Sequence, residues 1–185
     1  LPVPPGFTVT TAACNAYLAA GESMPEGLWE ETLAALSRLE SVSGKRFGEA
    51  TNPLLVSCRS GARYSMPGMM DTVLNIGLND VTVKGLIAKT GNARFVYDAY
   101  RRLVMMYADV VMEKAEGREP AQGKGIRKLM DERLEAMKRS RGVRSDTDLT
   151  ADDLKRLVAE FKAMVKKELG REFPEDPLRQ LWGGV

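Results

Sequence analysis

The sequence contains no histidine and only two cysteines, Cys14 and Cys58, in 185 residues. Without histidine, the chain cannot by itself form a Ser-His-Asp or Cys-His nucleophilic centre, whatever its serines and cysteines suggest. Two cysteines without histidine also cannot build an ordinary zinc site, and they are too few for a disulfide framework. The simplest interpretation is a protein of a reducing, cytoplasmic compartment.

Strong net charge and long apolar runs are also missing. The 27 lysines and arginines nearly balance the 25 aspartates and glutamates, which gives a net charge of +2. This balance favours neither a nucleic-acid-binding protein nor a membrane-surface protein. No apolar run approaches the length that a bilayer requires, and the sequence shows no signal-peptide pattern. We therefore expect no nucleic acid and no membrane as partner.

The length of the chain suits one domain, or one domain with a smaller lobe. The sequence begins Leu-Pro-Val-Pro-Pro-Gly without an initiator methionine. From this start we expect an internal piece of a larger protein.

Helical patterns account for most of the chain. Apolar spacing, capping residues and terminal glycines predict helices over about 10–20, 25–44, 79–89, 93–113, 126–137, 150–169 and a short stretch that ends near 182. The stretch 93–113 has the broadest apolar face, so we expect it to be the core helix. Apolar segments at 54–56 and 73–78 are typical of strands. The predicted fold class is α+β and predominantly helical, with residues 113–185 as a helical appendage.

The central run, 54–78, reads LLVSCRSGARYSMPGMMDTVLNIGL. An apolar strand leads into a loop of small and hydroxyl residues with two arginines, and a Pro-Gly turn and a second strand follow. Small residues let backbone N–H groups approach a phosphate, and a guanidinium offers a planar fork that matches phosphate oxygens. The run therefore predicts a polyanion cradle, and an ordinary solvated loop is the alternative.

The same run resembles the nucleotide-binding domain of the pyruvate, phosphate dikinases, which belong to the phosphoenolpyruvate-utilising enzymes. The segments LPVPPGFTVTT, SCRSGARYSMPGMMDTVLNIGLND, SDTDLTADDLK and FPEDPLRQLWG carry this resemblance across nearly the whole chain. The run Met69-Met70-Asp71 replaces the glutamine-containing version of the phosphoenolpyruvate synthases. The resemblance implies part of an ATP-grasp-like domain, with residues 1–112 as a partial ATP-binding lobe.

The resemblance also implies the site residues. Arg59 occupies the place of the arginine that holds nucleotide phosphates, so it is our candidate for both catalysis and nucleotide binding. Gly68, Thr72 and Leu74 match positions that contact the nucleotide. From the residues alone, a salt bridge for Arg59, a plain turn for Gly68 and a core strand position for Leu74 remain open alternatives.

Other residues of the run carry weaker signals. Arg63 is as compatible with a surface ion pair as with a ligand. Met66, Met69 and Met70 could pack on an adenine face, although such methionines are more often core filler. Asp71 is one carboxylate, and the family's metal-binding acids are expected beyond this chain, so we assign no metal ligand here.

Two charged features outside the run have structural explanations. Thr150 and Asp153 resemble a capping box, and the helix dipole explains Asp152 and Asp153 better than a catalytic pair does. The basic residues between 124 and 144 are interspersed with acids and have no aromatic residues among them to stack bases, so a solvated helix face is expected.

The resemblance implies the activity of the whole enzyme. Such an enzyme interconverts ATP, phosphate and pyruvate with AMP, pyrophosphate and phosphoenolpyruvate. It uses Mg²⁺ with ATP, a histidine on a swivelling domain that carries the phosphoryl group, and a separate pyruvate domain, and the full enzyme is expected to be a homodimer. Because this chain has no histidine, we expect it to be inactive alone.

Two rival interpretations remain. One is the ATP-binding part of another dikinase, such as a phosphoenolpyruvate synthase, against which the run Pro-Gly-Met-Met-Asp-Thr speaks. The other is a non-enzymatic helical interaction module whose arginine loop binds an acidic partner.

Overall fold

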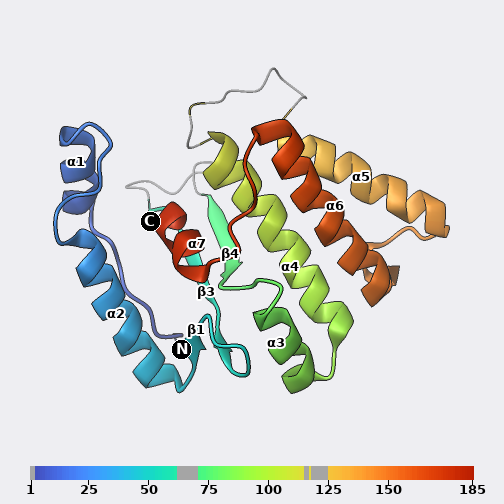
Figure 1. Cartoon of the computed structure of the whole chain (residues 1–185), viewed down its shortest axis with the longest axis horizontal. Helices are drawn as coiled ribbons and strands as arrows, with labels where there is room; N and C mark the ends of the chain where they lie inside the picture. Colours follow the sequence, from blue (N-terminus) through green and yellow to red (C-terminus); the bar gives the residue numbers. More distant parts are fainter. Residues whose placement is uncertain (1–2, 62–70, 115–116, 118–124) are drawn as a thin grey trace.

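The computed structural model describes residues 3–61, 71–114, 117 and 125–185. Helices predominate among these residues, and the strands form two short two-stranded sheets (Figure 1). This confirms the α+β, predominantly helical fold class that the sequence predicts.

The described chain starts with two helices, α1 (Thr11–Ala19) and α2 (Leu28–Ser43), which lie at one side of the molecule (Figure 1). Helix α1 buries none of its residues, whereas α2 buries one face. The expected start of α2 at Pro25 is wrong, because Gly27 adopts a left-handed φ of 80° and delays the helix to Leu28. The predicted end is confirmed, with Gly44 at φ 67° as the C-cap.

Two short sheets follow. Strand β1 (Arg46–Phe47) pairs in parallel with β2 (Pro53–Leu54), and β3 (Val56–Arg59) pairs antiparallel with β4 (Thr72–Ile76). The strands predicted at 54–56 and 73–78 therefore form, but the first apolar segment is divided between β2 and β3. We refer to β3 and β4 together as the motif hairpin.

Helices α3 (Thr82–Thr90) and α4 (Ala93–Tyr107) come next. The residue directly before α3 is Val81, and Asn79 Oδ1 accepts from the backbone N–H of Thr82 at 2.7 Å. Helix α4 continues into a π-helical segment, Ala108–Glu113. The predicted helix 93–113 thus has the expected extent, but it changes its winding in the last turns.

Helices α5 (Ile126–Arg141) and α6 (Ala151–Leu169) pack beside α4 to form a helical layer (Figure 1). Helix α4 also contacts α3 and β4, so its expected place as the core helix is confirmed. The fully buried side chains at the centre of this packing belong to α4 and α6: Tyr100, Leu103, Leu154, Leu157 and Phe161.

The predicted capping box at the start of α6 is confirmed. The Thr150 side chain accepts from the Asp153 backbone N–H, and the Asp153 carboxylate accepts from the Thr150 backbone N–H. Arg141 of α5 also donates to this carboxylate at 2.6 Å. Burial raises the pKa of Asp153, but the hydrogen bonds from Thr150 and Arg141 outweigh it, so the pKa lies below its ordinary value.

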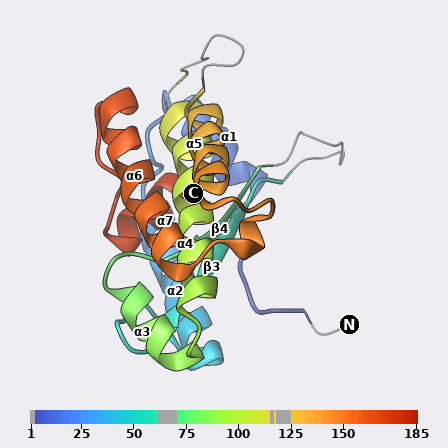
Figure 2. The ribbon, with the colours of Figure 1, turned by 90° about the vertical axis from the view of Figure 1, so that its right-hand side faces the viewer.

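The last helix, α7 (Pro177–Gly184), returns to the motif hairpin and contacts β4. Figure 2 shows the motif hairpin at one edge of the molecule, with α4 and α6 on one side of it. One cluster of buried apolar residues runs from Leu36 of α2 to Leu181 of α7. The division into a lobe of residues 1–112 and a helical appendage of residues 113–185 stays a prediction.

Candidate functional site

The motif hairpin places residues that are distant in sequence directly opposite each other. The register pairs Arg59 with Thr72, Cys58 with Val73, and Val56 with Ile76. Because Leu74 and Asn75 together oppose Ser57 alone, β4 contains a β-bulge. Asn75 takes up the extra residue with a left-handed φ of 62°, a conformation that asparagine tolerates better than most residues.

The inner face of the motif hairpin is part of the core. Val73 and Ile76 are 3% and 0% exposed, and β4 packs on α4 and α7. Cys58 lies on the same face, and burial raises the pKa of its thiol. A buried thiol of this kind is held neutral, which makes it an inert packing residue rather than a nucleophile.

The outer face carries the predicted site residues. Opposite residues of an antiparallel pair share one face, and alternate residues along a strand return to it. Arg59, Thr72 and Leu74 therefore lie together on the face opposite Cys58 and Val73. Arg59 is exposed, whereas Thr72 and Leu74 are half-buried. The structure thus brings three of the four predicted site residues together, while Gly68 lies outside the described residues.

Arg59 has a side chain available to a ligand. Within residues 3–61, 71–114, 117 and 125–185, we find no acid or other acceptor that bonds its guanidinium. The salt-bridge alternative therefore has no support in the described part of the chain. Of the other candidates in the run, Arg63, Met66, Met69 and Met70 also lie outside that part, and their predicted roles are untested.

Ser60 and Asp71, which directly follow β3 and directly precede β4, are hydrogen-bonded to each other. The Ser60 backbone N–H donates to the Asp71 carbonyl at 3.0 Å, and the Asp71 backbone N–H donates to Ser60 Oγ at 2.8 Å. These bonds extend the pairing one step beyond Arg59 and Thr72. They fix the point at which the chain leaves the hairpin, next to the exposed guanidinium.

Lys114 lies close to Asp71 at this end of the hairpin, and no pattern in the sequence indicated it. Its Nζ lies 3.9 Å from the Asp71 carboxylate and 3.5 Å from that of Asp109 in the π-helical segment. The approach depends on how the end of α4 meets the hairpin, so no local pattern could have predicted it.

Gln180 is a second residue that the sequence did not single out. It is fully buried in α7, and its amide bonds to backbone groups of Gly77 and Leu78, just after β4. These contacts join residues about a hundred positions apart in the chain. It lies in the segment FPEDPLRQLWG, which predicts a short helix and resembles the family but does not single out this glutamine.

The described residues do not fit a metal site. In the described ranges, no three His, Cys, Asp or Glu side chains gather as they would around a metal ion. Asp71, which directly precedes Thr72, pairs with Lys114 instead.

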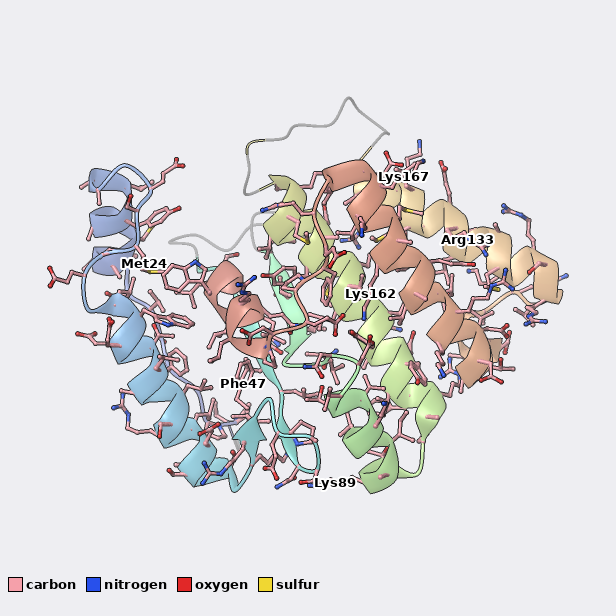
Figure 3. All side chains as sticks on the ribbon, in the orientation of Figure 1. Met24, Phe47, Lys89, Arg133, Lys162 and Lys167 are labelled. Atoms are coloured by element: carbon pink, nitrogen blue, oxygen red, sulfur yellow. The ribbon has the colours of Figure 1, made fainter. Side chains whose placement is uncertain are left out.

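One groove of the described residues lies away from the hairpin. A shallow groove of about 490 Å³ separates α5 from α6, and its lining includes Leu129, Arg133, Met164 and Lys167. Figure 3 shows Arg133 and Lys167 on this outer side of the helical layer. The groove contains none of the predicted site residues.

No helix in the described part of the chain has the length and apolar character needed to cross a membrane. No family model matches the sequence.

The chain is similar over its whole length to curated proteins. It is 51% identical over 186 residues to the pyruvate, phosphate dikinase of Clostridium symbiosum, a match that covers 100% of this chain and 20% of that protein. It is 51% identical over 181 residues to pyruvate, phosphate dikinase 1, chloroplastic, of Oryza sativa subsp. japonica, covering 98% of this chain and 18% of that protein. It is 47% identical over 186 residues to the pyruvate, phosphate dikinase of Rhizobium meliloti (strain 1021), a match that covers 100% of this chain and 19% of that protein. The chain therefore spans about a fifth of the length of these relatives.

Proposed function

We propose, from the premise that the chain belongs by sequence to the pyruvate, phosphate dikinase family, that its motif hairpin binds the phosphates of ATP. The observation that carries this proposal is the Arg59–Thr72 pair on the outer face of the hairpin. The opposite face is anchored in the core by Val73 and Ile76, so the pair is held on a packed support.

The chemistry of the pair suits a phosphoryl group. An arginine fork donates two parallel hydrogen bonds to phosphate oxygens, and a charge-assisted bond of this kind is about twice as strong as a neutral one. The hydroxyl of Thr72 supplies a further donor directly across the strands, typically about 5 Å away between Cα atoms. Leu74, two residues further along β4, offers apolar surface or backbone contact to the rest of the nucleotide. Gly68, which lies between the two strands in the sequence, would allow the backbone to approach the nucleotide closely.

In the whole enzyme, this site would serve the interconversion of ATP, phosphate and pyruvate with AMP, pyrophosphate and phosphoenolpyruvate. The role of Arg59 would be to orient the phosphates and to stabilise the charge that develops on the transferring group, as is usual in phosphoryl transfer. The histidine that accepts the group must belong to another part of the enzyme, because this chain has none. The ATP-grasp-like fold of the domain, the phosphohistidine and pyruvate domains as partners, the homodimer and the cytoplasmic location all belong to this proposal.

Mg²⁺ would accompany ATP. Since the described residues gather no cluster of metal ligands, they do not fit a magnesium site of their own. As the family resemblance implies, we assign the metal ligands to parts of the enzyme outside this chain, and we derive no step through the metal.

The chain alone is expected to be inactive. The absence of histidine removes the phosphoryl acceptor of the proposed cycle. Formation of AMP from ATP by the purified chain, dependent on pyruvate and phosphate, would contradict this expectation.

The proposed ATP site can be tested by calorimetric titration of the purified chain with Mg-ATP. We expect Arg59→Ala to raise the Kd about tenfold or more, since a hydrogen bond to a charged group contributes about 1.5–3 kcal/mol. Thr72→Val, which keeps the β-branched shape and removes the hydroxyl, should raise the Kd by a smaller factor.

The matched control is Arg46→Ala, which removes an exposed arginine from the short strand β1. It should leave the Kd unchanged. Equal Kd values for wild type and Arg59→Ala, or no binding by a chain that circular dichroism shows to be folded, would contradict the proposal.

A further inference from the structure

The last helix, α7, packs against the inner face of the same hairpin whose outer face carries Arg59 and Thr72. Its glycines bring the helix backbone into direct contact with neighbouring elements. A Cβ atom added at Gly184 would lie 3.1 Å from Cys58 Sγ and 3.2 Å from Ile76 Cδ1. A Cβ added at Gly183 would overlap the hydroxyl of Tyr107. At Gly184 the helix backbone therefore lies directly behind Cys58 and Ile76 of the motif hairpin.

Gln180 connects α7 to the end of β4 through its side-chain amide. Its Oε1 accepts from the Gly77 backbone N–H at 2.9 Å, and its Nε2 donates to the Leu78 carbonyl at 2.9 Å. The same Nε2 donates to the Pro174 carbonyl at 2.8 Å. A fully buried amide thus takes the place of a neighbouring strand where β4 leaves the sheet.

The segment that leads into α7 is itself fixed to the helical layer. Lys162, which Figure 3 labels on α6, forms ion pairs with Glu175 at 2.5 Å and with Asp80 at 2.8 Å. The Tyr100 hydroxyl of α4 reaches the same two carboxylates at 3.2 Å. The contacts of Glu175 hold the segment directly before α7 to α4 and α6, and the Tyr107 hydroxyl of α4 donates to the Arg179 carbonyl of α7 at 3.3 Å. Because α7 is tied to the helical layer in this way, it can fix the hairpin relative to the core.

We propose that α7 is a positioning element for the nucleotide site on the motif hairpin, with Gln180 as its positioning residue; this inference rests on the proposed function. An isolated two-stranded hairpin is at best marginally stable, so its geometry depends on what packs behind it. Cys58, which Gly184 touches, directly precedes Arg59 in β3. Gly77, which Gln180 bonds, directly follows β4. Helix α7 therefore acts on both strands, close to the bulge at Asn75.

Loss of the Gln180 hydrogen bonds would leave Gly77 and Leu78, which directly follow β4, without this restraint. The two strands could then shift relative to each other. A displacement of about 1 Å in a positioned group is enough to weaken its action strongly. The Arg59–Thr72 pair depends on strand register, so it would lose its alignment without losing either side chain.

The test uses the whole chain with Gln180→Leu, which keeps the volume of the side chain and removes its amide. Two quantities are measured at a temperature where the variant is folded: backbone amide exchange in residues 72–76, and the Kd for Mg-ATP. We expect exchange in β4 to accelerate at least tenfold, and the Kd to rise at least fivefold.

Two control variants separate positioning from general stability. Arg179→Ala changes an exposed residue of the same helix and should leave both quantities unchanged. Met137→Ala makes a cavity in α5, away from the hairpin, and should lower the melting temperature while β4 exchange and the Kd stay close to wild type. If Gln180→Leu behaves like Met137→Ala, the inference is overturned.

A second pair of variants keeps the test decisive if Gln180→Leu does not fold. Gly184→Ala should crowd Cys58 and Ile76 and raise the Kd about threefold, and Cys58→Ala in the same chain should restore part of the affinity, because the sulfur contact is removed. Failure of Gly184→Ala to change β4 exchange or the Kd would also overturn the inference. If wild type binds no Mg-ATP, the proposed function fails, and β4 exchange alone decides whether α7 positions the hairpin.

Discussion

Helices α5 and α6 of the helical layer carry arginines, as the motif hairpin does, but among the described residues Arg133 and Arg141 of α5 have acidic neighbours that Arg59 lacks. In the layer, Arg133 reaches Glu160 at 2.8 Å, and Arg141 reaches Asp153 at 2.5 Å. On the hairpin, Arg59 has no such acid within the described ranges. These two ion pairs neutralise the charges of Arg133 and Arg141 and join α5 to α6. The guanidinium of Arg59 is exposed on a strand whose other face is packed, and in the proposed function a phosphate takes the place of the acid.

The largest effect on this comparison is expected at the centre of the helical layer. Phe161→Ala should lower the free energy of unfolding by about 3–5 kcal/mol, because it empties a fully buried aromatic site between α4 and α6. Urea unfolding followed by circular dichroism measures the loss. A decrease below about 1 kcal/mol would show that Phe161 is not the packing centre that its burial indicates.

The next effect concerns the hairpin and the whole enzyme. In the proposed function, Arg59→Ala in the full-length protein should slow phosphoryl transfer from ATP by about a hundredfold or more, since it would remove stabilisation of the transferring group. A hundredfold change corresponds to about 2.7 kcal/mol. Rapid-quench kinetics of the ATP half-reaction measures it.

Arg133→Ala in the same protein serves as the control from the helical layer. Its charge already pairs with Glu160, so it should leave the rate near that of wild type. Near wild-type turnover with Arg59→Ala would remove the functional difference between the two regions.

A smaller effect is expected at the start of α6. Thr150→Ala should cost about 1 kcal/mol of unfolding free energy, because it removes the side-chain acceptor of a capping box. Nucleotide affinity should not change, since the cap lies in the helical layer. A change in the Kd for Mg-ATP without a change in stability would reverse the assignment of the two regions.

The smallest expected effect is a loss of folding stability at low pH. The Asp153 pKa is lower in the folded chain than in the unfolded chain, so the unfolded state binds more protons as the pH falls. The stability from this group is present above the ordinary aspartate pKa of about 4 and is lost as the pH falls through the folded value. Urea unfolding from pH 7 to pH 3 should show this loss, and Asp153→Asn should reduce its slope. An unchanged slope in that variant would exclude Asp153 as its source.

Local signals predicted much of the fold. The capping box of Thr150 and Asp153, the glycine ends of α2 and α6, and the apolar stripe of α4 depend on neighbours within one or two turns. The start of α2 was missed because the left-handed Gly27 overrode the preference of Pro25 for a first helical turn.

The candidate site was predictable only in part. The resemblance named Arg59, Thr72 and Leu74, but their common face depends on strand register and on the bulge at Asn75. The roles of Gln180 and Lys114 arise from contacts between distant segments, for which the sequence contains no periodic pattern.

The central claim is that the outer face of the motif hairpin binds nucleotide phosphates. The most direct test is a titration of the ¹⁵N-labelled chain with Mg-ATP, followed by the backbone amide resonances. The account predicts shifts at residues 57–60 and 72–75, and none along the outer side of α5 and α6. Shifts confined to the α5–α6 groove, or no shifts in a folded chain, would contradict it.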